Sequence, residues 1–249
     1  MTRMALISDI HGNLTALEAA LADIARQDVN ATVCLGDVAE LGPQPVAVIH
    51  RLRDLSIPVV MGNTDDWLLH PQREHKRGDE AKQEDIGFWA AGQLTAADSA
   101  LMAAYAPTLT FDLDGTSLLC YHGSPRSCEE RIEPETPTKK LDEYFKEQQG
   151  TLLAGGHTHE AMVRRYGESV IINPGSAGLP MIHPNPGSEK PTYNPSWAEY
   201  ALIEARGQEL TISLRRVPYS LDDLIVAVRA SGMPHPEYYL ADWRWAAQV

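Results

Sequence analysis

Side chains that bind metal ions recur along this sequence in short, similar patterns. The patterns are Asp9-Ile10-His11, Gly36-Asp37, Gly62-Asn63, His122-Gly123 and Gly156-His157-Thr158-His159. A mixture of imidazole and carboxylate ligands suits Mn²⁺, Fe, Ni²⁺ or Zn²⁺ better than a calcium site built only from oxygen atoms. Each pattern alone is more often a turn or a helix cap, because Asp and Asn favour those positions. Together in one chain, the patterns predict a metal centre.

The spacing within two of the patterns brings metal ligands together locally. Residues i and i+2 of an extended chain point the same way, so Asp9 with His11, and His157 with His159, are each expected to reach one site. Glycines flank most of the ligands and permit tight turns and close approach of the backbone. They are Gly12, Gly36, Gly62, Gly123, Gly155 and Gly156.

The predicted strands explain how distant patterns come together. Apolar strands are expected at residues 4–8, 31–35, 57–61, 117–121 and 151–154, and one of the patterns follows each strand. In open α/β sheets, ligands bind beyond the carboxyl ends of the strands. The alternation of strands and helices over residues 4–61 favours a mostly parallel sheet covered by helices. Asn13 or Thr15 is the expected cap of the first helix.

The rest of the chain contains a helical region, hairpins and a loop. Residues about 66–106 are expected to be a helical insertion near the site. Asp114-Gly115 and Gly167 predict the turns of two β-hairpins, and residues 199–217 form a third pair of strands. The proline-rich residues 179–195 predict an irregular loop, and helices are expected at 138–149 and, as the last helix, from Ser220 onward. Residues 1–249 are expected to be a single domain with a C-terminal extension at about 218–249.

The composition narrows the range of partners. The net charge of −13 argues against a nucleic-acid polymer, because an acidic surface repels a phosphate backbone. The odd number of cysteines, three, fits a reducing compartment. The N-terminal residues lack the pattern of a secretion signal, and no apolar run approaches the roughly 20 residues that span a membrane. We expect a cytoplasmic protein with no membrane partner, and a homo-oligomer is left open.

The ordered series of patterns resembles the calcineurin-like metallophosphoesterases over residues about 4–217. The motifs that carry the resemblance are Asp9-x-His11, Gly36-Asp37-x-x-Glu40, Gly62-Asn63-x-Asp65, His122-Gly123 and Gly156-His157-x-His159. The run Asn173-Pro174-Gly175-Ser176 is similar to that of a small bacterial and archaeal phosphodiesterase branch. The resemblance implies a four-layer αββα sandwich of two mixed sheets with flanking helices, and a two-metal site at their shared edge.

The resemblance also implies a role for each ligand. Asp9, His11 and His159 would hold the first ion, and Asn63, His122 and His157 the second. Asp37 would bridge both ions, for which Mn²⁺ is the first expectation and Fe, Ni²⁺, Zn²⁺ or Mg²⁺ are alternatives. A metal-bridging hydroxide would then attack phosphorus in line, with Asp37, Asn63 and His122 as the catalytic residues. Glu40 and Asp65 are expected to orient the histidines or to hold the loops in place, with a helix cap as the equal alternative for either residue.

The chain departs from the family at two positions. Many members have a histidine, thought to protonate the leaving group, where this chain has Thr64, and a threonine hydroxyl is no acid near neutral pH. We therefore expect a preference for good leaving groups, with His183 as a less favoured substitute acid. Glu40-Leu41-Gly42 stands after Asp37 where protein phosphatases carry Asp-Arg-Gly. Arg126 is therefore a candidate substrate contact, together with Asn63 and His122.

Three functions remain open from the sequence. The leading one is hydrolysis of a phosphodiester or phosphomonoester in a small phosphorylated substrate. A binding or scaffold protein with weak or no catalysis is the alternative from another class, and a eukaryotic retromer subunit resembles the family in that way. A nucleotidase or pyrophosphohydrolase would share the metal site and differ only in the pocket.

Overall fold

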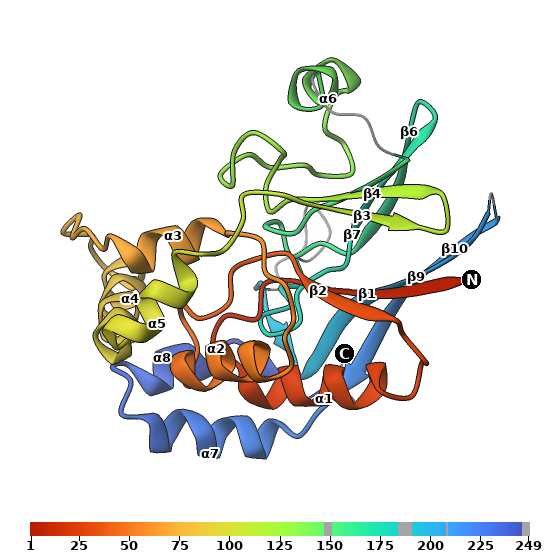
Figure 1. The fold of residues 1–249 in the computed structure, drawn as a ribbon. Helices are drawn as coiled ribbons and strands as arrows, with labels where there is room; N and C mark the ends of the chain where they lie inside the picture. Colours follow the sequence, from red (N-terminus) through yellow and green to blue (C-terminus); the bar gives the residue numbers. More distant parts are fainter. Residues whose placement is uncertain (147–150, 184–190, 208, 246–249) are drawn as a thin grey trace.

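Two mixed β-sheets form the centre of a computed structural model, which describes residues 1–146, 151–183, 191–207 and 209–245 (Figure 1). The first sheet has the strand order β10-β9-β1-β2. Its strands are β1 (Thr2–Ile7), β2 (Ala31–Cys34), β9 (Trp197–Arg206) and β10 (Glu209–Pro218). β1 pairs in parallel with β2 and antiparallel with β9, so the sheet is mixed.

The second sheet has the strand order β3-β4-β5-β7-β6. Its strands are β3 (Leu109–Leu113), β4 (Thr116–Cys120), β5 (Leu152–Ala154), β6 (Met162–Tyr166) and β7 (Ser169–Asn173). β4, β5 and β7 are parallel, and the outer pairs are antiparallel. The predicted hairpins around Asp114-Gly115 and Gly167 are confirmed as β3-β4 and β6-β7.

Apolar clusters separate four layers. The strand β1 is buried on both faces, because Ala5 and Ile7 point toward helices while Met4 and Leu6 point toward the other sheet. The helices α1 (Leu14–Ile24) and α2 (Pro45–Asp54) cover the outer face of the first sheet, and α6 (Thr138–Tyr144) covers that of the second. The expected αββα sandwich is therefore confirmed. Asn13 caps α1, since its side chain accepts the Ala16 N–H at 3.0 Å.

Helices also gather at one end of the molecule (Figure 1). They are α3 (Asn63–Leu69), α4 (Asp79–Gln93), α5 (Ala96–Met102), α7 (Leu221–Ser231) and α8 (Pro236–Leu240). Ile86 of α4 shares an apolar cluster with Leu224 of α7 and Trp243, so the C-terminal residues pack against the helical region. Trp243 belongs to β11 (Trp243–Arg244), which pairs with β8 (Asn194–Pro195). The proposed domain limits stay a prediction.

Three expected elements differ in the structure. Residues 57–61 form no named strand, because Pro58 has no N–H to donate and only isolated bridges at Val59 and Val60 remain. The helix expected at 138–149 ends at Tyr144, and residues 147–149 lie outside the described part of the chain. Ser220 caps α7 as expected, but α7 is not the last helix, because α8 follows it.

The proline-rich region 179–195 is only partly described. Ile182 pairs with Tyr193 in an isolated bridge, and β8 ends the region, so it is less irregular than expected. Residues 184–190 lie outside the description. Across the described ranges, no helix combines the length and the apolar character that crossing a membrane requires.

Candidate metal centre

The metal-type side chains predicted from the sequence meet in two neighbouring groups. One group is Asp9, His11 and His159, and the other is Asp37, His122 and His157. Within each group, one ligand atom from every residue lies within 4.8 Å of the others. Both groups take ligands from loops after strands of both sheets, so the centre lies where the two sheets share an edge. Such groups of carboxylates and imidazoles could each hold a metal ion.

Distances in the first group fit a divalent ion. His11 Nε2 lies 3.0 Å from His159 Nε2, and His159 Nε2 lies 3.3 Å from Asp9 Oδ1. Nitrogen ligands bind such ions at roughly 2.1 Å, so two of them at right angles stand about 3 Å apart. Two ring nitrogens that face each other without an ion share only a single hydrogen bond at best. The first group therefore has the spacing that a common ion would impose.

Asp37 lies between the two groups. Its Oδ2 is 3.3 Å from His122 Nε2 in its own group and 3.8 Å from His11 Nε2 in the other. Asn63 adds an amide oxygen to the second group, since its Oδ1 is 3.0 Å from His122 Nε2. The carboxylate of Asp37 is thus within reach of both groups, as the bridging role requires.

Backbone carbonyl oxygens fix the orientation of three of the histidines. His11 Nδ1 faces Glu40 O at 3.2 Å, His122 Nδ1 faces Leu35 O at 2.8 Å and His159 Nδ1 faces Leu179 O at 2.7 Å. A carbonyl oxygen can only accept, so each Nδ1 carries the proton and donates it. The lone pair of Nε2 is then free to bind a metal ion, as is usual for histidine ligands.

Most ligand residues have a strained backbone. Eleven non-glycine residues in the described part of the chain have a positive φ, and five of them are Asp9, His11, Asp37, His157 and His159. The expected extended conformation of the two i, i+2 pairs is therefore wrong, although both pairs do converge on the centre. Residues other than glycine are uncommon in the left-handed region, and such strain gathers at functional sites.

Buried hydrogen bonds hold the ligand loops in place. The carboxylate of Asp65 accepts the backbone N–H groups of Asp37 at 2.8 Å, Val38 at 2.9 Å and Gly62 at 3.1 Å. Asp65 thus joins the loop that carries Asp37 to the start of α3, which carries Asn63. These contacts match the loop-holding alternative for Asp65. The bond from the N–H of Gly62, the N-cap residue of α3, matches the helix-cap alternative as well.

Asn173 and Ser176, for which no individual role was predicted, contact the loops that carry the ligands. Asn173 donates from its amide to Gly156 O at 2.8 Å and to Thr158 Oγ1 at 3.0 Å. Ser176 donates its hydroxyl to Asp9 O at 2.7 Å. These residues position the loops of both ligand pairs. The Asn-Pro-Gly-Ser run was the available signal, but sequence spacing could not say which loops it contacts.

The ionisation of the ligands is coupled. Burial lowers the pKa of His11 to about 4, and the charge of His159 acts in the same direction. Burial would also lower the pKa of His122, but the Asp37 carboxylate outweighs it and raises this pKa to about 10. In turn, burial opposes ionisation of Asp37, whereas His122 holds its pKa well below the usual range. In the metal-free centre, a proton on His122 therefore supplies the positive charge beside Asp37 that a metal ion would otherwise supply.

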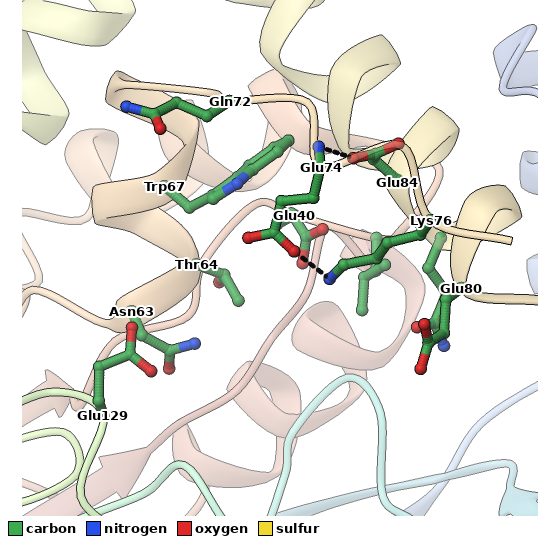
Figure 2. A pocket seen from close by; sticks show the side chains of 12 residues that line it. Glu40, Asn63, Thr64, Trp67, Gln72, Glu74, Lys76, Glu80, Glu84 and Glu129 are labelled. Carbon is green, nitrogen blue, oxygen red and sulfur yellow. Dashed lines mark hydrogen bonds and ion pairs between the residues drawn. The ribbon is translucent and has the colours of Figure 1, made fainter.

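A cavity of about 390 Å³ lies beside this centre and is partly lined by Asn63 and Thr64 (Figure 2). The Thr64 hydroxyl is buried and has no hydrogen-bond partner in the described residues. Glu40 also lines the cavity, where burial and the carboxylates of Asp37 and Asp65 raise its pKa to about 8. Glu40 thus contributes its carbonyl to His11 and turns its carboxyl group toward the cavity.

Other candidate residues lie outside the two metal groups. The guanidinium of Arg126 forms an ion pair with Glu130 at 2.5 Å and stacks over Tyr144, so its role in substrate binding stays a prediction. His183 is exposed, and its Nδ1 lies 3.1 Å from Thr192 Oγ1.

Comparisons with known proteins agree with the fold. The family model of the calcineurin-like phosphoesterase superfamily domain matches residues 2–206. An uncharacterized protein from Methanocaldococcus jannaschii is 26% identical over 227 residues, which cover 88% of each chain. The crystal structure of a metallophosphoesterase from Sphaerobacter thermophilus is 26% identical, with a TM-score of 0.71 over 97% of this chain and 99% of that one.

A hypothetical protein from Pyrococcus horikoshii OT3 has the same fold. Its TM-score is 0.76 at 18% identity, over 96% of this chain and 97% of that one. The family model extends over the second sheet, over β1, β2 and β9 of the first sheet, and over all the residues of the two metal groups. The chain therefore belongs to the calcineurin-like phosphoesterase superfamily and is a hydrolase that acts on phosphoester bonds.

Proposed function

We propose that this phosphoesterase hydrolyses a phosphodiester or phosphomonoester with two divalent cations at the centre. Asp9, His11 and His159 would hold one ion, and Asn63, His122 and His157 the other. The observation that carries this proposal is the position of Asp37, whose Oδ2 lies 3.3 Å from His122 Nε2 and 3.8 Å from His11 Nε2. A carboxylate between two imidazole groups offsets the repulsion between two nearby cations.

Each group of residues at the centre would have its own role in catalysis. Bound divalent ions, with Mn²⁺ as the first candidate, would act as Lewis acids on the phosphoryl oxygens and lower the pKa of water. Asp37 keeps its negative charge, because His122 stabilises the ionised form. Asn63 lines the adjoining cavity, and its Oδ1 lies 3.0 Å from His122 Nε2, so these two side chains would position the phosphoryl group. The backbone carbonyls behind His11, His122 and His159 keep those rings in one orientation.

The size of the adjoining cavity and the net charge of the protein favour a small substrate. A cavity of about 390 Å³ is within the range of roughly 300–1,000 Å³ that is usual for small-molecule sites. The net charge of −13 opposes a nucleic-acid polymer. All three cysteines are free, which is consistent with the proposed reducing, cytoplasmic environment. The scaffold alternative is not favoured by any specific observation.

The test is hydrolysis of bis-p-nitrophenyl phosphate and p-nitrophenyl phosphate by metal-stripped protein, with Mn²⁺, Mg²⁺, Ni²⁺ or Zn²⁺ added back. Asp37→Asn should lower kcat by at least about 10²-fold, because it removes the charge between the two ions. The matched control is Asp28→Asn, the same change at an exposed residue that also has a positive φ of 50°. Turnover without added metal, or unchanged kcat in Asp37→Asn, would refute the two-metal mechanism.

A further inference from the structure

The cavity beside Asn63 is bounded by carboxylates and an aromatic ring (Figure 2). Its walls come from α3, from α4 and from the segment between them, together with Glu40 and Leu41 after β2 and Glu129 after β4. Asn63 and Thr64 form the side nearest the metal centre, so a substrate held at the centre would extend into this space. The lining includes five glutamates and a single lysine: Glu40, Glu74, Glu80, Glu84, Glu129 and Lys76.

Two of the five glutamates are already paired. Glu74 lies 3.3 Å from Lys76 Nζ, and Glu84 lies 3.4 Å from Arg73 Nη1. The carboxylates of the other three glutamates, Glu40, Glu80 and Glu129, have no hydrogen bond or ion pair within the described residues. Figure 2 shows Glu129 beside Asn63 and Glu80 on the opposite side, so unpaired carboxylates face the cavity from different directions.

Glu40 and Trp67 lie side by side at the back of the cavity. A Cβ added at Gly87 would stand 2.9 Å from Glu40 Oε1 and 3.0 Å from the Trp67 ring, so both groups rest against this glycine. Trp67 is half-buried and packs edge-on against Phe88 at 5.3 Å between ring centroids. A carboxylate next to an indole ring is a combination that can bind alkylammonium groups, through charge and cation–π attraction.

We propose that the substrate is a phosphate ester in which one ester substituent carries an alkylammonium group, and that this group occupies the cavity lined by Glu40, Trp67, Glu80 and Glu129. This inference rests on the proposed phosphoesterase function, because the phosphate must lie at the metal centre for the substituent to reach the cavity. Glu40 and Trp67 are the specificity-determining residues, and Gly87 provides the space they need.

The same charges act against a nucleotide or a pyrophosphate. A second phosphate in the cavity would place negative charge beside the carboxylates of Glu80 and Glu129, and like charges a few ångströms apart repel each other. A cation reverses the sign of this interaction. The cavity therefore disfavours the nucleotidase and pyrophosphohydrolase alternatives that share the metal centre.

The test compares two diesters that differ in one charge. p-Nitrophenyl phosphocholine and p-nitrophenyl 3,3-dimethylbutyl phosphate have the same shape and the same leaving group. Water attacks phosphorus in both, the P–O bond to the aryl group breaks, and p-nitrophenolate leaves with the bonding electron pair. We expect kcat/KM to be about tenfold higher for the choline ester, which corresponds to about 1.4 kcal/mol. High salt should reduce this ratio.

Variants of the cavity residues test which side chains cause the preference for the choline ester. Glu40→Gln and Trp67→Leu should each lower the ratio of the two kcat/KM values at least about threefold. If Glu40→Gln does not fold, the double variant Glu80→Gln/Glu129→Gln removes the other two carboxylates of the proposed cation site, which lie at exposed positions, and should also lower the ratio. Glu168→Gln, at the exposed β6-β7 turn, is the matched control and should leave the ratio unchanged. Each ratio is taken within one variant, so a general loss of activity cancels.

The outcomes separate the two proposals. Equal kcat/KM for both diesters in the wild type, with clear metal-dependent turnover, would overturn the alkylammonium inference and leave the phosphoesterase function intact. A preference for the 3,3-dimethylbutyl ester, which lacks the ammonium charge, would overturn it as well. No turnover of either diester with any added metal would count against the proposed function itself. A choline preference that persists in all the cavity variants would move the cation site elsewhere on the molecule.

Discussion

Thr64 lies between the predicted ligand Asn63 and the loop-holding Asp65. Its backbone N–H donates to Asp37 Oδ1 at 2.9 Å, and its hydroxyl is buried without a partner among the described residues. The side chain therefore borders both the metal centre and the cavity but supplies no acid. In the family that the chain resembles, a histidine often stands at this position. The missing acid is a property of a single side chain rather than of the fold.

Thr64→His should restore a proton donor at this position. Rates with poor alkoxide leaving groups should rise at least about tenfold relative to p-nitrophenyl esters, because a positioned general acid contributes about 10²–10⁴-fold when the leaving group needs a proton. The measurement is kcat against the pKa of the leaving group for a series of esters. Thr64→Gln is the control, since it has similar bulk and no titratable group. An identical slope in wild type and Thr64→His would contradict the prediction.

Asp65→Asn should loosen the centre without removing a ligand. The amide can accept at only one of its two polar atoms, so at least one of the backbone N–H groups of Asp37, Val38 and Gly62 loses its acceptor. We expect the free energy of unfolding to fall by about 2 kcal/mol and metal affinity to fall by about tenfold to 100-fold. Urea unfolding and titration calorimetry measure these quantities. Asp66→Asn, the exposed neighbour, should change neither.

For single residues, the sequence predicts which side chains come together at the metal centre, but it does not predict the backbone conformation that brings them there. The identities of the ligands follow from residue type and position after strands. The left-handed backbone conformation of Asp9 and His157 cannot be predicted in this way, because tertiary contacts impose the strain and no residue preference encodes it. The cavity position of Glu40 likewise depends on α4, which a local pattern cannot place against residue 40.

The helix α5 illustrates how single elements are held together. Thr95 and Asp98 cap its N-terminus in a reciprocal capping box, and Asp98 Oδ1 also lies 2.7 Å from His50 Nε2 of α2. Hydrogen bonds from Thr95 and His50 lower the pKa of Asp98 to about 2. The ionised carboxylate thus joins two helices as well as capping one of them.

The stability contributed by Asp98 should depend on pH. Its pKa is lower in the folded protein than the unfolded value of 3.8, so the contribution is present above about pH 4 and is lost as pH falls toward about 2. Asp98→Asn should lower the free energy of unfolding by about 1 kcal/mol at pH 7, and less near pH 3. Urea unfolding across this range measures the difference. Asp222→Asn, in the first turn of α7, is the control, and a pH-independent effect of Asp98→Asn would contradict the linkage.

Local sequence patterns predict a helix, strand or turn correctly only where interactions between neighbouring residues determine its structure. The Asp114-Gly115 hairpin follows from turn chemistry, and the α1 cap from Asn13. Residues 57–61 have the apolar composition of a strand, yet Pro58 interrupts the ladder and leaves only isolated bridges to Cys34 and Ala106. The pairing partner of each strand depends on the whole chain, so β9, which is far away in the sequence, could not be placed beside β1.

On the scale of the whole molecule, the metal centre joins the two sheets. Asp9, His11 and Asp37 lie in loops that follow β1 and β2 of the first sheet, whereas His122 and His157 follow β4 and β5 of the second. Both layers also contribute to the apolar core between them, through residues such as Leu6 and Leu118. Ions bound at the shared edge would therefore connect two layers that otherwise meet through apolar packing.

Metal binding should accordingly stabilise the entire fold. An ion that binds only the folded state at 100 times its Kd adds about 2.7 kcal/mol, which for a chain of this length raises Tm by about 5–10 °C. Thermal unfolding of metal-stripped protein with and without Mn²⁺ measures the shift. Asp28→Asn should keep the full shift, whereas Asp37→Asn should lose most of it, because Asp37 contacts both groups. An unchanged Tm in wild type at saturating metal would mean that the ligands, although assembled, do not bind the ion more tightly when folded.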